Sequence, residues 1–399
     1  MRKALLTTVS AGAMLAAGPA LAADMVSVGV GGYMQQWFGV SGVDATDKDG
    51  KATAVEGGVA QQSDSEIHFR GKLEADNGLT FSVKVELEGN SRASGKNGKS
   101  DSPIDESQLT ISSEFGQIVL GAEDGASVLT HHGNRDVGIS MLCGDVGKWI
   151  NGVSGCPSGS KMGFGTAGHG VVGDSNKISY FTPRMNGVQA GVSYVPNTGQ
   201  EGENAPLGNN DHDAVSLGAN YVGDFGGASV AVSAGFFSAS QTIKKPDTVK
   251  TYGSDGTAAE ATLALEKAYP AKKIDERTFA NFGLTVDFGG IGFDVAYAEN
   301  DGGLYKMADD KEVKNGAADY EVVSAGVNYT EGPMAVSLGH YMAEDDDGSE
   351  SNATMLSLSY TLAPGVVSRS SLFAAEQSKG TDKTSAEGTA FVTGITLSF

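Results

Sequence analysis

From residue 26 onward the chain repeats one pattern, in which stretches of about ten residues alternate between apolar and polar side chains. Residues 66–74 and 79–88 show it most clearly, and Asn77-Gly78 between them is a dipeptide typical of a tight hairpin. Alternation with a period of two gives each strand one apolar and one polar face. The pattern therefore predicts an all-β chain built from antiparallel hairpins.

The alternating stretches favour a membrane barrel over a soluble two-layer sandwich. Short and long connections alternate strictly, and the polar faces carry charged and small residues. Aromatic residues fall near strand ends, as in an interfacial girdle: Tyr194, Tyr221, Phe236, Tyr297, Tyr329, Tyr360 and Phe399. The count is about 16 strands, and lipid cannot satisfy a free strand edge, so we predict a closed, roughly 16-stranded antiparallel transmembrane β-barrel with an aqueous channel.

The long connections are expected on the extracellular side and the short turns on the periplasmic side. The long ones are residues 41–62, 90–105, 123–175, 196–212, 238–276, 300–319, 343–351 and 376–387. Residues 123–175, hereafter the third loop, form the longest connection. A loop of this length in a compact domain is usually functional, and we expect it to fold inward and constrict the pore.

The N-terminus predicts export. Arg2 and Lys3 precede a short apolar stretch, and Ala20-Leu21-Ala22 matches a signal-peptidase site. We expect residues 1–22 to be a signal peptide and residues 23–399 to be the barrel domain.

Composition and motifs argue against several functional classes. The chain has 49 acidic and 28 basic residues and a net charge of −21, which argues against nucleic acid as a partner. Residues 163–168 match GxGxxG but lie in a polar loop, and no GxSxG occurs, so no enzyme is expected. His131-His132 has no third ligand at an informative spacing. No cofactor or metal centre is expected, although the acidic loop tips at residues 47–50 and 345–348 could hold Ca²⁺ or Mg²⁺ that bridge lipopolysaccharide phosphates.

The chain resembles the general Gram-negative porins, especially the α-proteobacterial type. The resemblance rests on the strand rhythm, on residues 105–112 leading through 114–116 to 121–125, and on a last strand that ends in Phe399. It implies a homotrimer in the outer membrane, in contact with lipid and lipopolysaccharide, that passes small hydrophilic solutes. It also implies that residues 123–125 open the inward loop and that Phe399 is part of the signal read by the barrel-assembly machinery.

The resemblance further implies a constriction in which basic wall residues face acidic loop residues. By strand parity His68, Arg70, Lys72 and Lys84 point into the lumen. The loop carboxylates that could oppose them are Glu123, Asp124, Asp136 and Asp145. Alternatively, the basic residues are ordinary wall residues paired with Glu66, Glu86 or Glu88.

Acidic residues in the long loops predict a weakly cation-selective pore. The same fold also supports substrate-specific channels for sugars or phosphate, and a barrel enzyme is a further alternative. Sugar channels line the lumen with aromatic residues. Since most strand aromatics here fall on the lipid parity, a general diffusion pore is preferred.

The two cysteines of the chain, Cys143 and Cys156, both lie in the third loop, and an oxidising periplasm favours a disulfide between them. Closing a loop of about 14 residues stabilises by roughly 3 kcal/mol in the chain-entropy model. Reduction should leave the barrel folded but raise the open-channel noise, which single-channel recording with and without reductant measures. Alkylation of both thiols in the native protein without reductant would rule the bond out.

Overall fold

The computed structural model describes most of residues 26–399. The described residues are 26–53, 57–89, 93–94, 99–100, 104–133, 135–138, 146–150, 153, 173–198, 212–243, 272–301, 305–308, 311–314, 319–346, 348–380 and 384–399. The expected signal peptide, Asp145 and both cysteines lie outside them.

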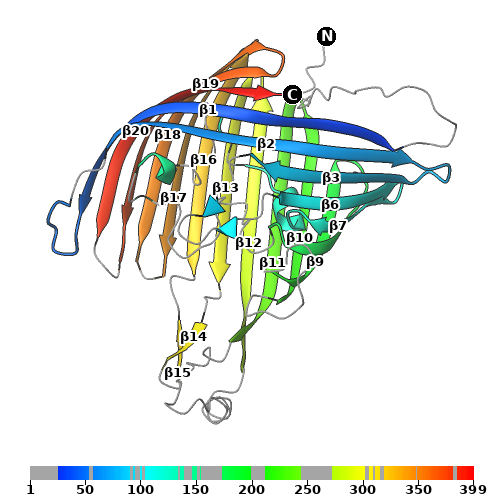
Figure 1. Ribbon diagram of the computed structural model, residues 1–399, viewed down its shortest axis with the longest axis horizontal. Coiled ribbons are helices and arrows are strands. Elements are labelled where there is room, and N and C mark those ends of the chain that lie inside the picture. Colours follow the sequence, from blue (N-terminus) through cyan, green and yellow to red (C-terminus); the bar gives the residue numbers. More distant parts are fainter. Residues whose placement is uncertain are drawn as a thin grey trace.

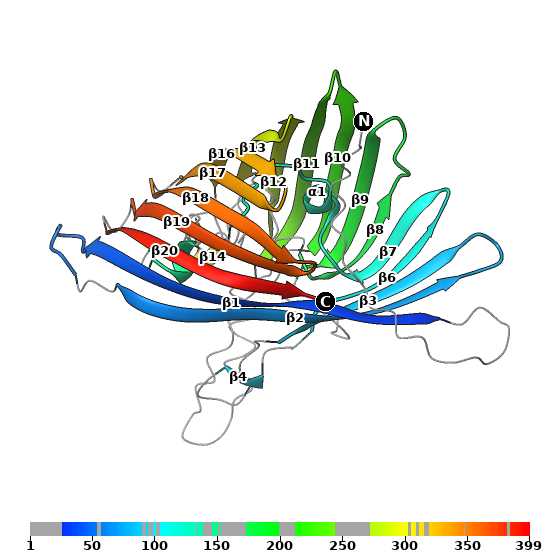
Figure 2. The same ribbon diagram turned by 90° about the horizontal axis from the view of Figure 1, so that it is seen from above.

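Sixteen antiparallel strands form one closed barrel, as predicted (Figures 1 and 2). Their bounds are β1 Ser27–Thr46, β2 Gly58–Glu74, β3 Thr80–Glu88, β6 Ile104–Ser113, β7 Gly116–Ala122, β8 Asn176–Phe181, β9 Val188–Asn197, β10 His212–Phe225, β11 Ala228–Ile243, β12 Lys272–Phe288, β13 Ile291–Asp301, β16 Tyr320–Glu331, β17 Met334–Asp345, β18 Glu350–Ala363, β19 Val366–Ser378 and β20 Ser385–Ser398.

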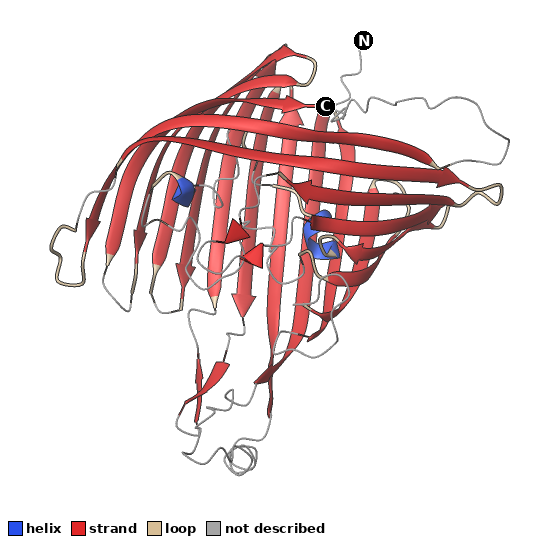
Figure 3. Ribbon diagram, in the orientation of Figure 1, coloured by secondary structure: helices blue, strands red, loops and turns tan. Residues whose placement is uncertain are grey.

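The remaining elements are short and lie in the long loops. Figure 3 shows that strands make up nearly all of the regular structure. The additional elements are β4 Ala93–Ser94, β5 Lys99–Ser100, β14 Tyr305–Ala308, β15 Lys311–Lys314, the α-helix α1 Ala126–Leu129 and the 3₁₀ helix η1 Val146–Lys148. Within the described part of the chain, no helix has both the length and the apolar character needed to cross a membrane.

The first and last strands close the barrel. β1 pairs with β20 from Tyr33 opposite Ser398 to Thr46 opposite Ser385. At the end of this seam Phe399 donates its amide to the carbonyl of Gly32 (3.1 Å), and the Gly32 amide donates to the carbonyl of Phe399 (3.0 Å). The C-terminal residue is therefore part of the seam.

Tight turns at one end of the barrel, the turn end, alternate with long connections at the other, the loop end. Gly226-Gly227 joins β10 to β11 with φ of 58° and 94°, and Gly289-Gly290 joins β12 to β13 with φ of 59° and 87°. Positive φ at both central residues is the geometry of a type I′ hairpin turn, which glycine adopts without strain. The strands run further than the alternation predicted: β1 continues to Thr46 and β11 to Ile243, so both following connections are shorter than expected.

The barrel is apolar outside and polar inside, the reverse of a soluble protein. Phe69, Leu338 and Leu397 on the outer face are 45%, 47% and 46% exposed. Serine and asparagine side chains on the inner face are buried instead, for example Ser193 and Asn281. Such an apolar exterior is stable only in lipid. The closed sheet suits this environment, because closure leaves no backbone group at an edge without a hydrogen bond.

Strand β19 follows the same rule, although two serines lie among its outward-facing positions. Leu372 is 52% exposed and Phe373 only 1% exposed, so even-numbered residues of β19 face outward and odd-numbered residues inward. Arg369 therefore faces the lumen, where it donates to the hydroxyl of Thr396 (2.6 Å). Ser368 and Ser370 face lipid, and Ser370 shares a hydrogen bond with Thr393 on β20 (2.8 Å). Cross-strand hydroxyl pairing lets Ser370 and Thr393 lie on the lipid face.

Deletion of Phe399 should lower the amount of folded barrel in outer-membrane fractions. The deletion removes an aromatic side chain on the lipid face and the residue that completes the seam with Gly32. Heat-modifiable mobility on gels measures the folded fraction. Phe399→Tyr, which keeps the ring and the backbone, should assemble like the wild type. Unchanged folded levels in the deletion variant would contradict the expected role.

Candidate functional site: the lumenal wall and the third loop

Strands β2 and β3 place the predicted basic residues on the lumenal wall. Arg70 and Lys84 stand opposite each other in the β2–β3 register. Their neighbours Phe69 and Val83 are 45% and 46% exposed on the outer face, so the basic side chains point inward.

Lys84 connects this wall with the third loop. Its ammonium lies 2.6 Å from Glu106 of β6, 3.2 Å from Glu123 and 3.3 Å from Glu86. Among the described residues, Lys84 is the predicted basic residue that contacts a predicted loop acid. The Lys84 ammonium of the wall and the Glu123 carboxylate of the loop form a direct ion pair.

Glu123 begins the third loop with its carboxylate held in place. Gln108 of β6 donates to one oxygen of Glu123, and the Asp124 amide donates to the other (3.0 Å). Burial alone would raise the pKa of Glu123, but the adjacent Lys84 ammonium and the Asp124 amide outweigh it and lower the pKa. Glu123 is therefore an anion at neutral pH.

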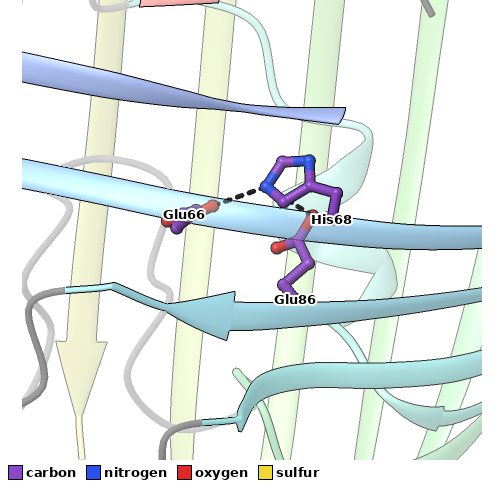
Figure 4. A group of neighbouring side chains, drawn as sticks. All are labelled: Glu66, His68 and Glu86. Atoms are coloured by element: carbon purple, nitrogen blue, oxygen red, sulfur yellow. Dashed lines mark hydrogen bonds and ion pairs between the residues drawn. The ribbon is translucent and has the colours of Figure 1, made fainter. Parts of the chain in front are cut away.

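His68 and Arg70 form a short network along β2. His68 Nε2 lies 2.7 Å from Glu66 and 3.4 Å from Glu86 of β3 (Figure 4). Arg70 Nη2 lies 2.7 Å from His68 Nδ1. Since a guanidinium only donates, Nδ1 accepts and the Nε2 hydrogen points to Glu66. Glu66 also accepts from the Tyr33 hydroxyl (2.7 Å), which fixes the carboxylate on the wall.

Lys72 lies apart from this group, close to the turn end of β2. It pairs with Glu74 at 2.6 Å, and both side chains are largely exposed. The structure thus brings His68, Arg70, Lys84 and Glu123 into one region of the wall and leaves Lys72 at its margin.

Lysine 177, which the sequence pattern did not single out, ties the two ends of the third loop together. Its side chain on β8 is only 3% exposed. The ammonium donates to the carbonyls of Glu123 and Gly173 and to that of Ser175 (2.6 Å). A buried ammonium requires such partners, because an unpaired charge would be strongly destabilising. The only signal in the sequence was a charged residue on an inward parity position next to the long loop.

Lumenal hydroxyl groups hold the first part of the third loop against the inside of the barrel. Backbone amides of the loop donate to serines on four strands: Ala126 to Ser193 (2.9 Å), Ser127 to Ser216 (2.9 Å), His132 to Ser233 (2.8 Å) and Val137 to Ser337 (3.1 Å). Each bond contributes on the order of 1 kcal/mol. The described start of the loop therefore runs along the inner wall from β9 to β17.

The predicted acid Asp136 lies on this far part of the wall, away from Lys84 and Arg70. It accepts from Ser337 (2.7 Å) and Ser357 (2.9 Å). Burial raises the pKa of Asp136, and these hydroxyl donors offset part of the rise. Burial also lowers the pKa of the neighbouring loop residue His131, to about 4, so this imidazole is neutral at physiological pH.

A second described part of the loop reaches the other side of the barrel. Gln62 of β2 donates to the Lys148 carbonyl (2.7 Å). The Trp149 ring packs against Gly39 of β1 and fills the space that a side chain at position 39 would occupy. Ile150 packs beside Gly388 of β20. The loop thus contacts the wall on nearly every side of the lumen.

Aromatic residues on the lumenal face were underestimated from the sequence. Trp37, Phe237, Phe279, Tyr320, Tyr341 and Phe373 lie on inward positions and are buried. Together with Val146, Trp149, Ile150 and Val153 of the third loop they belong to one apolar cluster. The parity argument missed them because it counted only the regular outer faces. Since these six side chains are buried, they do not form an exposed track for sugars.

The acidic loop tips use carboxylates to stabilise turns. Asp47 accepts from the amides of Asp49 and Lys51 (3.0 Å each), and Asp345 accepts from the amide of Ser349 (2.9 Å). Among the described residues, neither tip belongs to a cluster of three close metal-ligand side chains.

The family model for Gram-negative porins matches residues 7–371, and the chain belongs to this family. Solved structures agree. The anion-selective porin from Comamonas acidovorans is 18% identical with a TM-score of 0.58, covering 94% of this chain and 100% of that one. The outer membrane channel DcaP of Acinetobacter baumannii is 11% identical with a TM-score of 0.55, covering 94% and 97%. The trimer form of OmpT from Vibrio cholerae is 14% identical with a TM-score of 0.51, covering 92% and 99%.

Two curated relatives are uncharacterised proteins. One, from Rickettsia felis, is 25% identical over 228 residues, and one from Rickettsia conorii is 26% identical over 227 residues. Each match covers 48% of this chain and 48% of the relative, so the chain spans about half the length of the curated relatives it matches. The family model and the fold agree that the chain is a barrel of the Gram-negative porin type.

Gly283→Val should displace the third loop from the wall. A side chain at Gly283 of β12 would collide with the carbonyl oxygen of His132. The loop must then shift and lose its bond to Ser233, at a cost of about 1 kcal/mol. We expect a changed single-channel conductance and noisier open currents from a folded barrel. Gly42→Val is the control, because Gly42 has open space around it. Identical conductance and noise in Gly283→Val and the wild type would refute the anchoring role.

Proposed function

We propose that the protein forms a passive diffusion pore for ions and small hydrophilic solutes, with a weak preference for cations. One observation carries this proposal: carboxylates outnumber permanent cations on the lumenal wall of β2, β3 and β6. The acidic residues there are Asp64, Glu66, Glu86, Glu88 and Glu106, joined by Glu123 of the third loop. The cations on these strands are Arg70 and Lys84, together with Lys72, which pairs with the further acid Glu74 close to the turn end.

Nearby carboxylates neutralise much of the positive charge on this wall. Lys84 lies within 3.3 Å of three carboxylates, so its field in the lumen is largely cancelled. Arg70 is exposed on the wall, and among the described residues its side chain contacts a histidine rather than an acid. Arg70 is therefore the side chain best placed to repel cations and attract anions. We accordingly keep Arg70 as the principal basic residue of the proposed constriction.

Acidic residues near the loop end support the same preference. Asp44, Asp49 and Asp346 are exposed there. Such charges concentrate cations within about one Debye length, roughly 8 Å at physiological salt. The resulting selectivity should be largest in dilute salt.

The selectivity of the Comamonas acidovorans porin does not decide the sign here. At 18% identity the likeness concerns the fold, whereas ion preference depends on individual lumenal side chains. The acid-rich wall of this chain favours cations.

We propose a homotrimer, supported by the apolar outer surface and by the similar fold of the OmpT trimer form. Cleavage after residue 22, assembly through the barrel-assembly machinery and contact with lipopolysaccharide belong to the same proposal. They are supported by the N-terminal sequence, the terminal Phe399 and the family.

Reversal potentials in a salt gradient test the charge assignment. The wild-type pore should show a weak cation preference that fades as salt rises, because mobile ions screen the acidic residues. Arg70→Glu should increase the preference, since it replaces the exposed wall cation with an anion in a water-filled position. Lys379→Glu makes the same charge change in the connection between β19 and β20, at the loop end of the barrel, and should have a smaller effect on the ion preference. An anion-selective wild-type potential in dilute salt would overturn the proposal, and an unchanged Arg70→Glu pore would remove Arg70 from the constriction.

A further inference from the structure

Three metal-ligand side chains meet on the lumenal wall in an arrangement that the sequence spacing concealed. Glu66 and His68 come from β2, and Glu86 stands opposite His68 on β3. Their ligand atoms all lie within 4.8 Å of one another, and each residue is partly buried (Figure 4). Since the ligands come from two paired strands, no short sequence motif indicates the cluster.

We propose that Glu66, His68 and Glu86 bind a divalent transition-metal ion of the Zn²⁺ class. One imidazole nitrogen and two carboxylate oxygens suit Zn²⁺, with water from the lumen as the fourth ligand. A purely acidic cluster would instead suit Ca²⁺ or Mg²⁺, so the imidazole is what selects the ion. Binding does not depend on the proposed ion selectivity of the pore.

The distances fit such an ion with small movements. Tetrahedral bonds of about 2.0 Å put neighbouring ligand atoms about 3.3 Å apart. His68 Nε2 is already 3.4 Å from Glu86 Oε1, and it is 2.7 Å from Glu66 Oε2, with which it shares a hydrogen bond. The ion would replace the Nε2 hydrogen, and Glu66 would have to retreat by roughly 0.6 Å. A long side chain makes this adjustment without backbone movement.

Neighbouring side chains orient the ligand atoms. The Tyr33 hydroxyl holds Glu66 Oε1, which orients Oε2 toward His68. Outer hydrogen bonds of this kind strengthen metal sites. Lys84 lies 3.3 Å from Glu86 Oε1, the same oxygen that faces His68, so its ammonium would have to move off this atom when the ion binds. Glu106, at 2.6 Å, is the closer partner that Lys84 keeps.

The all-carboxylate group Glu106, Glu123 and Asp124 is a weaker candidate. Its ligand atoms are equally close, but the Lys84 ammonium already lies against Glu106 and Glu123. A cation there would have to displace a bound cation.

Arg70 opposes metal binding. With the ion on Nε2, His68 carries its hydrogen on Nδ1, and two donors would then face each other at the contact with Arg70. The exposed guanidinium must therefore move away from His68. Replacing Arg70 should strengthen binding, whereas replacing a ligand should weaken it. These opposite signs distinguish a metal site from general loss of structure.

Calorimetric titration of the folded, detergent-solubilised full-length mature protein with Zn²⁺ tests the site. The wild type should bind about one ion per chain. His68→Gln and Glu86→Gln should weaken binding at least about tenfold, whereas Arg70→Gln should tighten it. His212→Gln is the matched control, because His212 also lies 2.9 Å from a carboxylate, that of Asp213, but outside the cluster. It should bind Zn²⁺ like the wild type, and Ca²⁺ at equal concentration should not compete.

Four results would overturn the proposal: no saturable Zn²⁺ binding, wild-type affinity in His68→Gln, equal displacement by Ca²⁺, or weaker binding in Arg70→Gln. Heat-modifiable mobility establishes that each variant is folded. Because calorimetry applies no salt gradient or voltage, its outcome is independent of the reversal potentials, and either proposal can fail while the other stands.

Discussion

Closure of the hydrogen-bonded sheet is the constraint on which the rest of the structure depends. In lipid an unpaired backbone amide or carbonyl costs several kcal/mol, so the pairing of β1 with β20 is a condition for the whole barrel. The seam reaches the last residue, where Phe399 and Gly32 exchange hydrogen bonds. Once the sheet is closed, its stability rests on backbone bonds and the apolar exterior. The inner face is then free to carry charges and to hold a loop.

The third loop uses this freedom. Its amides donate to serines on strands distant in sequence, and its later residues join aromatic side chains of the wall in an apolar cluster. Serine is small enough to let the backbone approach and supplies the acceptor that a buried amide requires. Polar tethers fix the first part of the loop, and apolar packing fixes the second. The remaining acid-rich wall of β2, β3 and β6 faces the lumen.

The sequence predicted the fold well because strand parity and turn chemistry are local. Parity alone placed Arg70 and Lys84 inward, and Asn77-Gly78 marked the hairpin between β2 and β3. The path of the third loop was beyond such reasoning, since its contacts are long-range: Asp136 and Ser357 are 221 residues apart. The partner of each wall cation depends equally on contacts across strands. Parity could not tell that Lys84 would meet Glu123 while Lys72 paired locally with Glu74.

Ion preference in this architecture is consequently a property of side chains and not of the fold. Outward residues and backbone bonds stabilise the barrel whatever the lumen contains, so inward positions can change charge at little cost to stability. This explains how a chain with an acid-rich wall shares its fold with a porin described as anion-selective. Within this wall the balance is set by how each cation is paired. Lys84 is neutralised by the carboxylates that anchor the loop, whereas Arg70 contacts an imidazole and keeps its charge exposed to the lumen. The same imidazole therefore contacts the Arg70 charge through Nδ1 and the hydrogen or proposed metal ion through Nε2.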